Sequence, residues 1–490
     1  MAPPGVPPVP MTSPAPDAPR DQWTDLLSRA HAPSVAVLMG GVVLYAFYVF
    51  IVATILPSIA GDLGGLALYA WVTTTFVVGS TAGSAACAAL VSRRGLPGAY
   101  RVAALLFGIG SLTCAIAPTM AILLVGRGLQ GLGGGLLNAL AYAVIRRMLP
   151  EALRARAIAM VSGVWAVPAL SGPFVGGLFA TLGQWRLAFW LAVPVVLAFG
   201  VLPGRVLPGR PERAQGAPIA VARLTLLGGA ALAVSAGSVA GRPWPALVGI
   251  FFATTLMAGL FMLDRRATVR LLPTGAFDPR NVVGAASLTM ALLVVGTSLM
   301  PFVPYFLRTA SHQSATVAGY VGALLALGWT FAALLPAAVR PDAARRAIVM
   351  APVGMALGLL AVATGLLVGS LALVVSAWAL VGVGIGLGWA HLGTLMIRAA
   401  VPSERDLTAA FISTVQMIAL AFGSALTGMV ANLLGLPETA GPSAAARVGF
   451  WLFSLFMAAP LAALLVTRRV LVGTGPIASH PTSDRSRLDS

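Results

Sequence analysis

The sequence predicts an all-α integral membrane protein with fourteen transmembrane helices. Hydrophobic residues make up 58% of its 490 positions and charged residues only 9%, with a mean hydropathy of +0.92. This composition lies far outside that of soluble domains. A bilayer core about 30 Å thick requires roughly 20 apolar residues per helix, and segments of that length recur along the chain between loops rich in Arg, Pro and Gly.

The predicted helices are separated by short loops rich in Arg, Pro and Gly. In order, the predicted spans are 34–57, 68–91, 100–117, 119–145, 157–182, 186–203, 219–240, 244–263, 282–307, 315–338, 346–368, 371–399, 407–434 and 447–467.

The arginines predict the topology. All 31 basic residues are arginines, and when alternate loops are compared about 26 fall on one side of the membrane and only Arg186, Arg242, Arg308 and Arg447 on the other. By the positive-inside rule the arginine-rich side is cytoplasmic. We therefore expect a multi-pass protein of the inner (plasma) membrane with both termini in the cytoplasm. The net charge of +17 then reflects topology and attraction to the lipid bilayer, and no nucleic-acid partner is expected.

The predicted helices group into two related halves. Residues 34–203 form an N-terminal six-helix bundle, 204–281 a linker with two extra transmembrane helices, and 282–467 a C-terminal six-helix bundle. Residues 1–33, rich in proline, and residues 468–490 are predicted to be disordered cytoplasmic tails.

A shared glycine pattern supports an internal duplication. An offset of 253 aligns Gly131, Gly133, Gly135 and Asn138 with Gly384, Gly386, Gly388 and His391, and an offset of 252 aligns Pro150 with Pro402. In transporters built from repeats, the binding site lies near the midplane between the halves. The alternative is a chance likeness between two glycine-rich helices.

Four segments carry the motifs of a known family. "GRGLQGLGGG" (126–135) is similar to the fourth-helix signature of the major facilitator superfamily, and "ALSGPFVGG" (169–177) resembles the fifth-helix motif of its antiporters. "VATILPSIAGDLG" (52–64) and "YAWVTTTFVV" (69–78) resemble its fourteen-helix drug:proton antiporter branch (EmrB/QacA-like). The resemblance implies the major facilitator fold, two six-helix bundles plus two inserted helices, and drug efflux by an antiporter.

The resemblance also implies roles for particular residues. It assigns Gly172, Pro173, Gly176 and Gly177 to an antiporter motif that seals the resting pathway, with a merely kinked packing helix as the alternative. It assigns Arg93 and Gly95, in the segment "ALVSRRG" (89–95), to the cytoplasmic gate. Here the sequence departs from the family, because Ser92 stands where the family usually has an aspartate.

A second departure concerns the carboxylates. The branch commonly has an aspartate in the first helix, but all fourteen carboxylates of this chain fall in predicted tails, loops or helix ends. A proton-coupled exporter needs a group in the membrane that changes its protonation state, and arginine does not. His391, roughly 10 Å from the cytoplasmic end marked by Arg398, is the remaining candidate, for coupling or for substrate contact. The alternative is a hydrogen-bonded packing histidine.

Arg127 is the other candidate, because a charge inside a predicted helix costs about 2.5–3.5 kcal/mol on insertion scales. Its expected partners are backbone carbonyls, Gln130, water or an anionic ligand, and Asp62 is the nearest acid. Asn138 and Tyr142 are expected to add hydrogen bonds to the substrate. A purely structural brace is the alternative role for Arg127.

These features predict a secondary active transporter that exports lipophilic or amphipathic small molecules by alternating access. The missing carboxylates favour neutral or anionic compounds, and they keep open the alternative of an importer or facilitator of a neutral or anionic metabolite or lipid. The chain contains no lysine and therefore no phosphate-binding loop for ATP, so a gradient of protons or another ion is expected to drive transport. No HExxH or GxSxG motif suggests an enzyme. No metal or cofactor is expected, and we expect a monomer.

Overall fold

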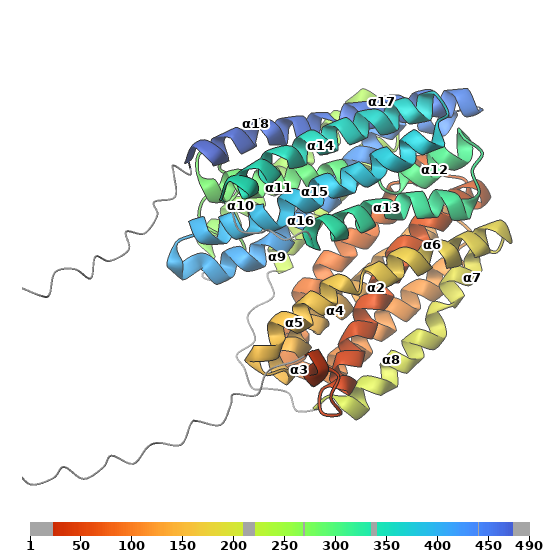
Figure 1. Ribbon diagram of the computed structural model, residues 1–490. Coiled ribbons are helices and arrows are strands. Elements are labelled where there is room, and N and C mark those ends of the chain that lie inside the picture. The colour runs from red at the N-terminus through yellow and green to blue at the C-terminus, as the bar shows by residue number, and fades with distance from the viewer. Residues whose placement is uncertain (1–22, 209–220, 268–269, 335–340, 440, 474–490) are drawn as a thin grey trace, which may run out of the picture.

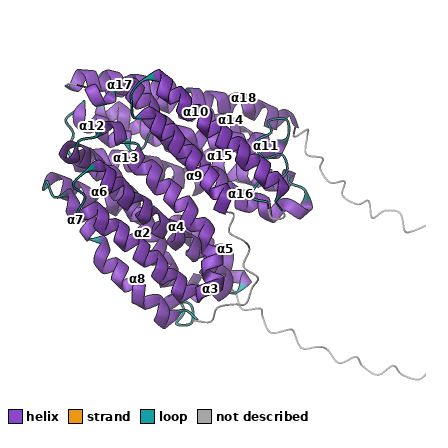
Figure 2. Cartoon of the chain, turned by 180° about the vertical axis from the view of Figure 1, so that it is seen from behind, coloured by secondary structure: helices purple, strands orange, loops and turns teal. Residues whose placement is uncertain are grey.

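In the computed structural model the chain is built from α-helices and short loops (Figure 1). The structure describes residues 23–208, 221–267, 270–334, 341–439 and 441–473, and these contain no strand (Figure 2). The prediction of an all-α protein is confirmed for these residues. Most of the two predicted tails, residues 1–22 and 474–490, lies outside them.

The first bundle comprises the helices α1 to α8 and one short 3₁₀ helix. Their bounds are α1 (Trp23–Leu26), α2 (Ala32–Leu63), η1 (Leu66–Leu68), α3 (Trp71–Ala115), α4 (Met120–Met148), α5 (Glu151–Gly163), α6 (Ala166–Thr181), α7 (Trp185–Trp190) and α8 (Ala192–Val206). Helix α1 falls within the segment predicted to be a disordered tail.

An inserted hairpin, α9 (Val221–Ser238) and α10 (Pro243–Arg266), precedes the second bundle. The second bundle comprises α11 (Val282–Thr297), α12 (Phe302–Thr309), α13 (Ala315–Leu334), α14 (Pro341–Leu367), α15 (Leu371–Ala399), η2 (Pro402–Glu404), α16 (Arg405–Leu433), η3 (Leu436–Glu438), α17 (Pro442–Phe456) and α18 (Ala458–Gly473).

Twelve helical stretches of the described chain are long and apolar enough to cross a membrane. One of them, Leu66–Ala115, has 50 residues, enough for two crossings, and the described apolar part of α9 (Ala222–Ser238) is shorter than the rest. The chain reverses inside α3 at Gly95, whose φ of 69° and ψ of 175° suit a residue without a Cβ. The count of fourteen crossings, which needs α3 to cross twice and α9 once, stays a prediction.

Several predicted helices are broken in the structure. The predicted span 157–182 consists of α5 and α6, and the predicted span 282–307 consists of α11 and α12 with Pro301 at the break. Proline lacks the N–H that would continue the hydrogen-bond ladder of a helix. Pro301 therefore interrupts the helix for only a few residues, between Thr297 and Phe302. The spans 186–203 and 447–467 are divided in the same way, into α7 with α8 and α17 with α18.

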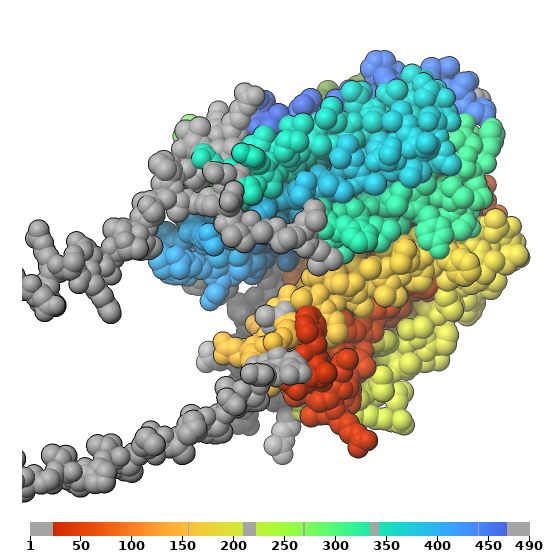
Figure 3. Space-filling model, viewed as in Figure 1, coloured from red at the N-terminus to blue at the C-terminus, as the bar shows by residue number. Residues whose placement is uncertain are grey.

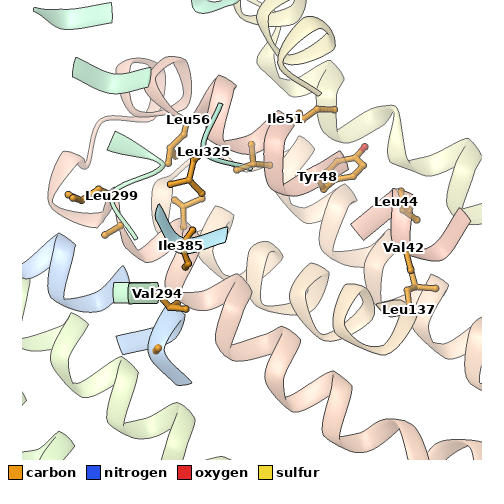
Figure 4. Close-up of a cluster of buried hydrophobic side chains, with 14 of the residues drawn as sticks. Val42, Leu44, Tyr48, Ile51, Leu56, Leu137, Val294, Leu299, Leu325 and Ile385 are labelled. Atoms are coloured by element: carbon orange, nitrogen blue, oxygen red, sulfur yellow. The ribbon is translucent and has the colours of Figure 1, made fainter. Parts of the chain in front are cut away.

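The two bundles meet at one end of the molecule and diverge at the other. In Figure 1 they meet at the right, near α6, α12 and α13, and diverge at the left, where α5 and α16 begin. The space-filling view shows the same notch between the orange and blue lobes (Figure 3). One large buried cluster joins side chains of α2 and α4 with side chains of α11, α13 and α15, including Leu44, Leu56, Leu137, Leu325 and Ile385 (Figure 4).

Candidate functional site

Arg127 lies near the start of α4, the end predicted to be outer, and only 2% of its surface is exposed. Its Nε donates a hydrogen bond to the Val72 carbonyl at 3.3 Å, its Nη1 donates to Gln130 Oε1, and its guanidinium lies 4.1 Å from the centre of the Phe76 ring. Gln130 donates to Ser111 Oγ at 2.8 Å. Among the described residues no carboxylate pairs with Arg127. Carbonyl and amide oxygens and an aromatic face therefore replace a counter-ion, the first two as expected.

Close packing of glycines fixes the position of this arginine. A Cβ on Gly131 or Gly135 would overlap the carbonyl oxygens of Phe76 or Ser80 in α3, and one on Gly133 would overlap the backbone of the second half of α3. Backbones that approach this closely hold membrane helices together by dispersion and weak hydrogen bonds. Helix α4 is therefore wedged between the two halves of α3, with its arginine one turn before the glycines.

The two bundles repeat this packing in a different register from the predicted one. Helices α4 and α15 both have 29 residues, and their N-cap hydroxyls, Thr119 and Ser370, are 251 residues apart. Gly131 packs on the backbone of α3, and Gly382, also 251 residues later, packs on the backbone of α13. The predicted offset of 253 was therefore wrong. Glycines recur at alternate positions in both helices, so an alignment shifted by two residues matches the same number of them.

The corrected register changes which residues are equivalent. His391 corresponds to Leu140, and the prediction that it takes the place of Asn138 was wrong. The counterpart of Arg127 is Trp378, which is fully buried.

Trp378 repeats the contact of Arg127 without its charge. Its Nε1 donates to the Gly322 carbonyl of α13 at 3.1 Å, as Arg127 Nε donates to the Val72 carbonyl of α3. Each bundle thus ties its central helix to a carbonyl near the outer end, with a cation in the first bundle and a neutral indole in the second.

Asn138, Tyr142 and His391 lie towards the opposite ends of α4 and α15. Tyr142 is 43% exposed and the other two are partly exposed, and none of the three has a hydrogen-bond partner among the described residues. At 1.5 Å per residue, Asn138 and Tyr142 lie about 16 and 22 Å along α4 from Arg127. The predicted polar residues therefore form two groups, a buried one around Arg127 and Gln130 and an accessible one nearer the cytoplasmic end.

Asp62 belongs to neither group. It lies at the outer end of α2, where it accepts hydrogen bonds from Arg186 at 2.7 Å and from Trp185 Nε1 at 3.0 Å. Arg186 also donates to the Ala117 carbonyl at 3.2 Å. The side chain of Asp62 is 49% exposed, so this pair joins α2, α7 and the loop after α3 at the outer surface.

The predicted antiporter motif lies where α6 meets both bundles. A Cβ on Gly172 would contact Phe50, and one on Gly176 would contact Thr54, both in α2 of the same bundle. A Cβ on Gly177 would overlap Thr316, in α13 of the other bundle. Pro173 is buried within α6. The motif therefore lets α6 approach α2 and α13 closely, and its gating role stays a prediction.

The predicted cytoplasmic gate residues lie at the reversal in α3. Gly95 is the reversal itself, and Arg93 is exposed. Ser92, which replaces the usual acid, donates to the Ala89 carbonyl of its own helix at 2.9 Å. This hydrogen bond lies within α3 and does not join the two bundles.

Hydrogen bonds between the bundles, which the sequence did not reveal, gather at the outer end. Tyr69 donates to the Pro301 carbonyl at 2.9 Å and Thr74 Oγ1 to Ser424 Oγ at 3.0 Å. Two further bonds join elements 250 and 365 residues apart: Arg308 donates to Ser58 Oγ at 2.6 Å, and Asn432 Nδ2 to the Ala67 carbonyl at 2.9 Å. We call these four bonds the outer latch.

Aromatic side chains lie just inside the point where α6 and α13 meet. Trp165 packs edge-on against Tyr45 and Phe50, with ring centres 6.0 and 6.5 Å apart. In the second bundle Trp329 and Trp389 form a similar pair at 5.3 Å. All three tryptophans are partly exposed.

The described fold and these contacts define a two-bundle transporter, and comparisons with known proteins agree. Residues 38–339 match the family model described as Major Facilitator Superfamily. The chain is 37% identical over 484 residues to a protein of Mycobacterium tuberculosis named "Probable multidrug-efflux transporter Rv1634", covering 95% of this chain and 97% of that one. It is 26% identical to "Multidrug resistance protein 3" of Bacillus subtilis, over 61% of this chain and 60% of that one.

Solved structures share the fold at low sequence identity. A bacterial homologue of the human lysosomal transporter Spinster, in an inward-facing and unoccupied conformation, aligns with a TM-score of 0.63 at 16% identity, over 92% of this chain and all of that one. The xylose transporter XylE of E. coli, partially occluded and inward open, aligns with a TM-score of 0.61 at 14% identity, over 90% and 98% of the two chains.

The chain therefore belongs to the major facilitator superfamily.

Proposed function

We propose that the protein is a secondary active transporter that exports lipophilic or amphipathic small molecules by alternating access. The main support is the shape of the molecule: two bundles with the same internal packing are latched together at the end predicted to be outer and diverge at the arginine-rich end (Figures 1 and 3). The name of the M. tuberculosis relative, which spans nearly the whole chain, supports the direction of transport.

The described state is inward-open under the predicted topology. To release a substrate outside, the two bundles must rock about a site between them near the membrane midplane and break the outer latch. Most of its bonds are neutral, and each contributes about 0.5–1.5 kcal/mol. A small differential affinity of substrate or ion for the two states is enough to shift such an equilibrium.

The accessible residues favour an apolar substrate with few charges. Trp165, Trp329 and Trp389 supply aromatic surface, while Asn138 and Tyr142 supply unpartnered polar groups among the described residues. Small-molecule sites are commonly lined in this way, by aromatic surface with a few polar groups. No carboxylate lies among them to balance an organic cation, so neutral or anionic amphiphiles are favoured.

Coupling to an ion gradient is part of the proposal. His391 is partly exposed towards the inner end of α15 and has no partner among the described residues, which suits a group that gains and loses a proton. Arg127 is already satisfied by protein groups and is proposed to act as a brace. The transporter is proposed to work as a monomer in the inner membrane with cytoplasmic termini, because the pathway lies between two bundles of one chain.

Dye retention in cells tests this proposal. Cells that express the chain are expected to retain less lipophilic dye than the same host without it, and an uncoupler that collapses the proton gradient should abolish the difference. His391→Phe should weaken the response to the uncoupler. Retention that rises with expression would contradict export and support the import alternative.

A further inference from the structure

Two seams run between the bundles, and the inserted hairpin lies over one of them. Helix α9 packs against α3 of the first bundle and α16 of the second, and Val77, Ala231 and Ala421 from these three helices form one buried cluster. Helix α10 packs outside α9 and turns Leu247 and Phe251, each 65% exposed, away from the protein. Figure 2 shows the hairpin on the face turned towards the viewer.

The opposite seam, between α6 and α13, has no such cover among the described helices. Its two helices pack directly on each other (Figure 1). Exposed apolar side chains run along both of them, with Val167 and Phe174 57% exposed on α6 and Phe331 68% exposed on α13. In a bilayer this surface faces lipid.

The α6–α13 seam is closed at the outer end and opens inward. Ala169 and Ala323 pack together with Trp165 at mid-height. Beyond Trp165 the chain continues as α5, which packs against α1, α2 and α4 of its own bundle, and Ile158 is 45% exposed there. Trp165, which is partly exposed, therefore stands at the inner end of α6 beside this seam.

The hairpin is fastened to the second bundle. After α10 the chain turns back so that the buried Asp264 accepts hydrogen bonds from the backbone N–H groups of Leu271 and Leu272, at 2.8 and 3.0 Å. The next contact reaches the second bundle. Thr274, three residues after Leu271, donates its backbone N–H and its hydroxyl to Glu404 of η2, at 2.8 and 2.7 Å.

Aromatic packing adds to this attachment. Phe277 has a φ of 63°, a conformation that non-glycine residues adopt rarely, and its ring packs edge-on between Phe261 of α10 and Phe411 of α16 at 6.2 and 5.5 Å. Leu227 of α9 and Ile418 of α16 share another buried cluster. These contacts extend along the inner half of the hairpin.

The hairpin packs less extensively on the first bundle than on the second. Trp71 Nε1 donates to the Ser235 carbonyl at 3.2 Å. Gly228, without a side chain, faces Val78: a Cβ there would lie 2.9 Å from Val78 Cγ1. This single side-chain contact holds α9 to α3 less firmly than the interlocked backbones that hold α4 to α3.

We propose that the α9–α10 hairpin moves with the second bundle, slides over α3, and covers the α3–α16 seam in every state of the cycle. Entry from the membrane is then one-sided: an amphiphile dissolved in the inner leaflet enters between α5, α6 and α13. This inference rests on the proposed function, because it concerns the route that the exported compound takes.

Paired cysteines test the movement, in a background with Cys87→Ala and Cys114→Ala. Oxidation of the pair Leu227→Cys with Ile418→Cys joins the hairpin to the second bundle and should leave dye export unchanged. Oxidation of Gly228→Cys with Val78→Cys joins it to the first bundle and should stop export until a reductant restores it. The opposite pattern would overturn the proposal. Export by the reduced variants is read separately and reports on the proposed function.

Spin labels provide a second readout that does not depend on export. Labels at the exposed positions Phe252 on α10 and Leu433 on α16 should keep one distance distribution when a lipophilic substrate is added, whereas Phe252 and Phe174 on α6 should change theirs. A constant Phe252–Phe174 distance with a changing Phe252–Leu433 distance would show that the hairpin belongs to the first bundle.

A bulky side chain tests the route. Ser162 is exposed one turn before Trp165, on the same face of the chain, and Ser162→Trp is expected to slow export of a membrane-dissolved dye several-fold. Ala236→Trp, at an exposed position on the hairpin, is the matched control and should leave export unchanged. Equal loss in both variants, or loss in Ala236→Trp alone, would overturn one-sided entry.

Discussion

The hydrogen bond from Arg308 to Ser58 is the charged member of the outer latch, and Ser58→Ala removes it. A hydrogen bond to a charged group contributes about 1.5–3 kcal/mol. Arg308 is partly exposed, so water replaces part of that contribution and the lower value applies. A loss of about 1.5 kcal/mol from the inward-open state raises the ratio of outward-open to inward-open molecules roughly tenfold.

Cysteine labelling measures this shift. Thr54, only 1% exposed, lies under the latch against Gly176 and Gly319. In a chain without its native cysteines, Thr54→Cys should react with a membrane-impermeant thiol reagent from outside only when the outer end opens. We expect Ser58→Ala to speed this reaction about tenfold.

Two further variants complete the test. Ser58→Asp places a carboxylate opposite Arg308, strengthens the latch and should slow labelling and export together. Ser376→Ala is the matched control, because its hydroxyl bonds only to carbonyls of its own helix, α15, the nearer being Ala372 at 2.9 Å. If Ser58→Ala and Ser58→Asp both label at the rate of the parent, the latch does not contribute to the balance between the two states.

Three other predictions concern substitutions of buried or partly buried residues, two of them paired with a control residue of the same type in open or exposed surroundings. Gly135→Ala should lower thermal stability in detergent by about 1–3 kcal/mol because its Cβ overlaps the α3 backbone, whereas Gly128→Ala, with open space around it, should change stability by less than about 0.5 kcal/mol; equal effects would contradict the packing argument. Asp264→Asn should cost about 3–5 kcal/mol, seen as a lower melting temperature, because it breaks the buried ion pair with Arg223 of α9; an unchanged melting temperature would mean that this pair does not stabilise the hairpin. Trp165→Ala should reduce export of an aromatic dye about two- to tenfold, while Trp244→Ala, 69% exposed on α10, should not; equal losses would mean that Trp165 does not line the pathway.

Local signals in the sequence were enough to predict most of the helices. The span 371–399 coincides with α15 to the residue, because Ser370 caps its first turn and Pro402 follows its end. The predicted span 34–57 ends at Pro57, six residues before the end of α2. Membrane helices tolerate an internal proline because neighbouring groups satisfy the backbone that it leaves unpaired, so the helix continues. Breaks within a crossing, such as the one at Pro301, interrupt the helix without interrupting its apolar run.

The site was predictable in its composition but less so in its arrangement. The partners of Arg127 include Gln130, three residues along the same helix, which helical spacing indicates. The Val72 carbonyl and the Phe76 ring belong to α3. Helical spacing within α4 does not indicate which residues of another helix will contact Arg127. The register of the repeat failed for a similar reason, since alternate glycines fit two alignments and only the contacts with α3 and α13 distinguish them.

Transport by the purified chain in vesicles tests whether an ion gradient drives export. The chain is reconstituted with its arginine-rich face outward, so that the cytoplasmic side meets the medium, and a lipophilic dye is added outside together with an imposed proton gradient, acidic inside. We expect dye to accumulate inside against its concentration gradient, without nucleotide, and accumulation to stop when the proton gradient is collapsed. Dye that merely equilibrates, or accumulates equally without the gradient, would contradict export driven by an ion gradient.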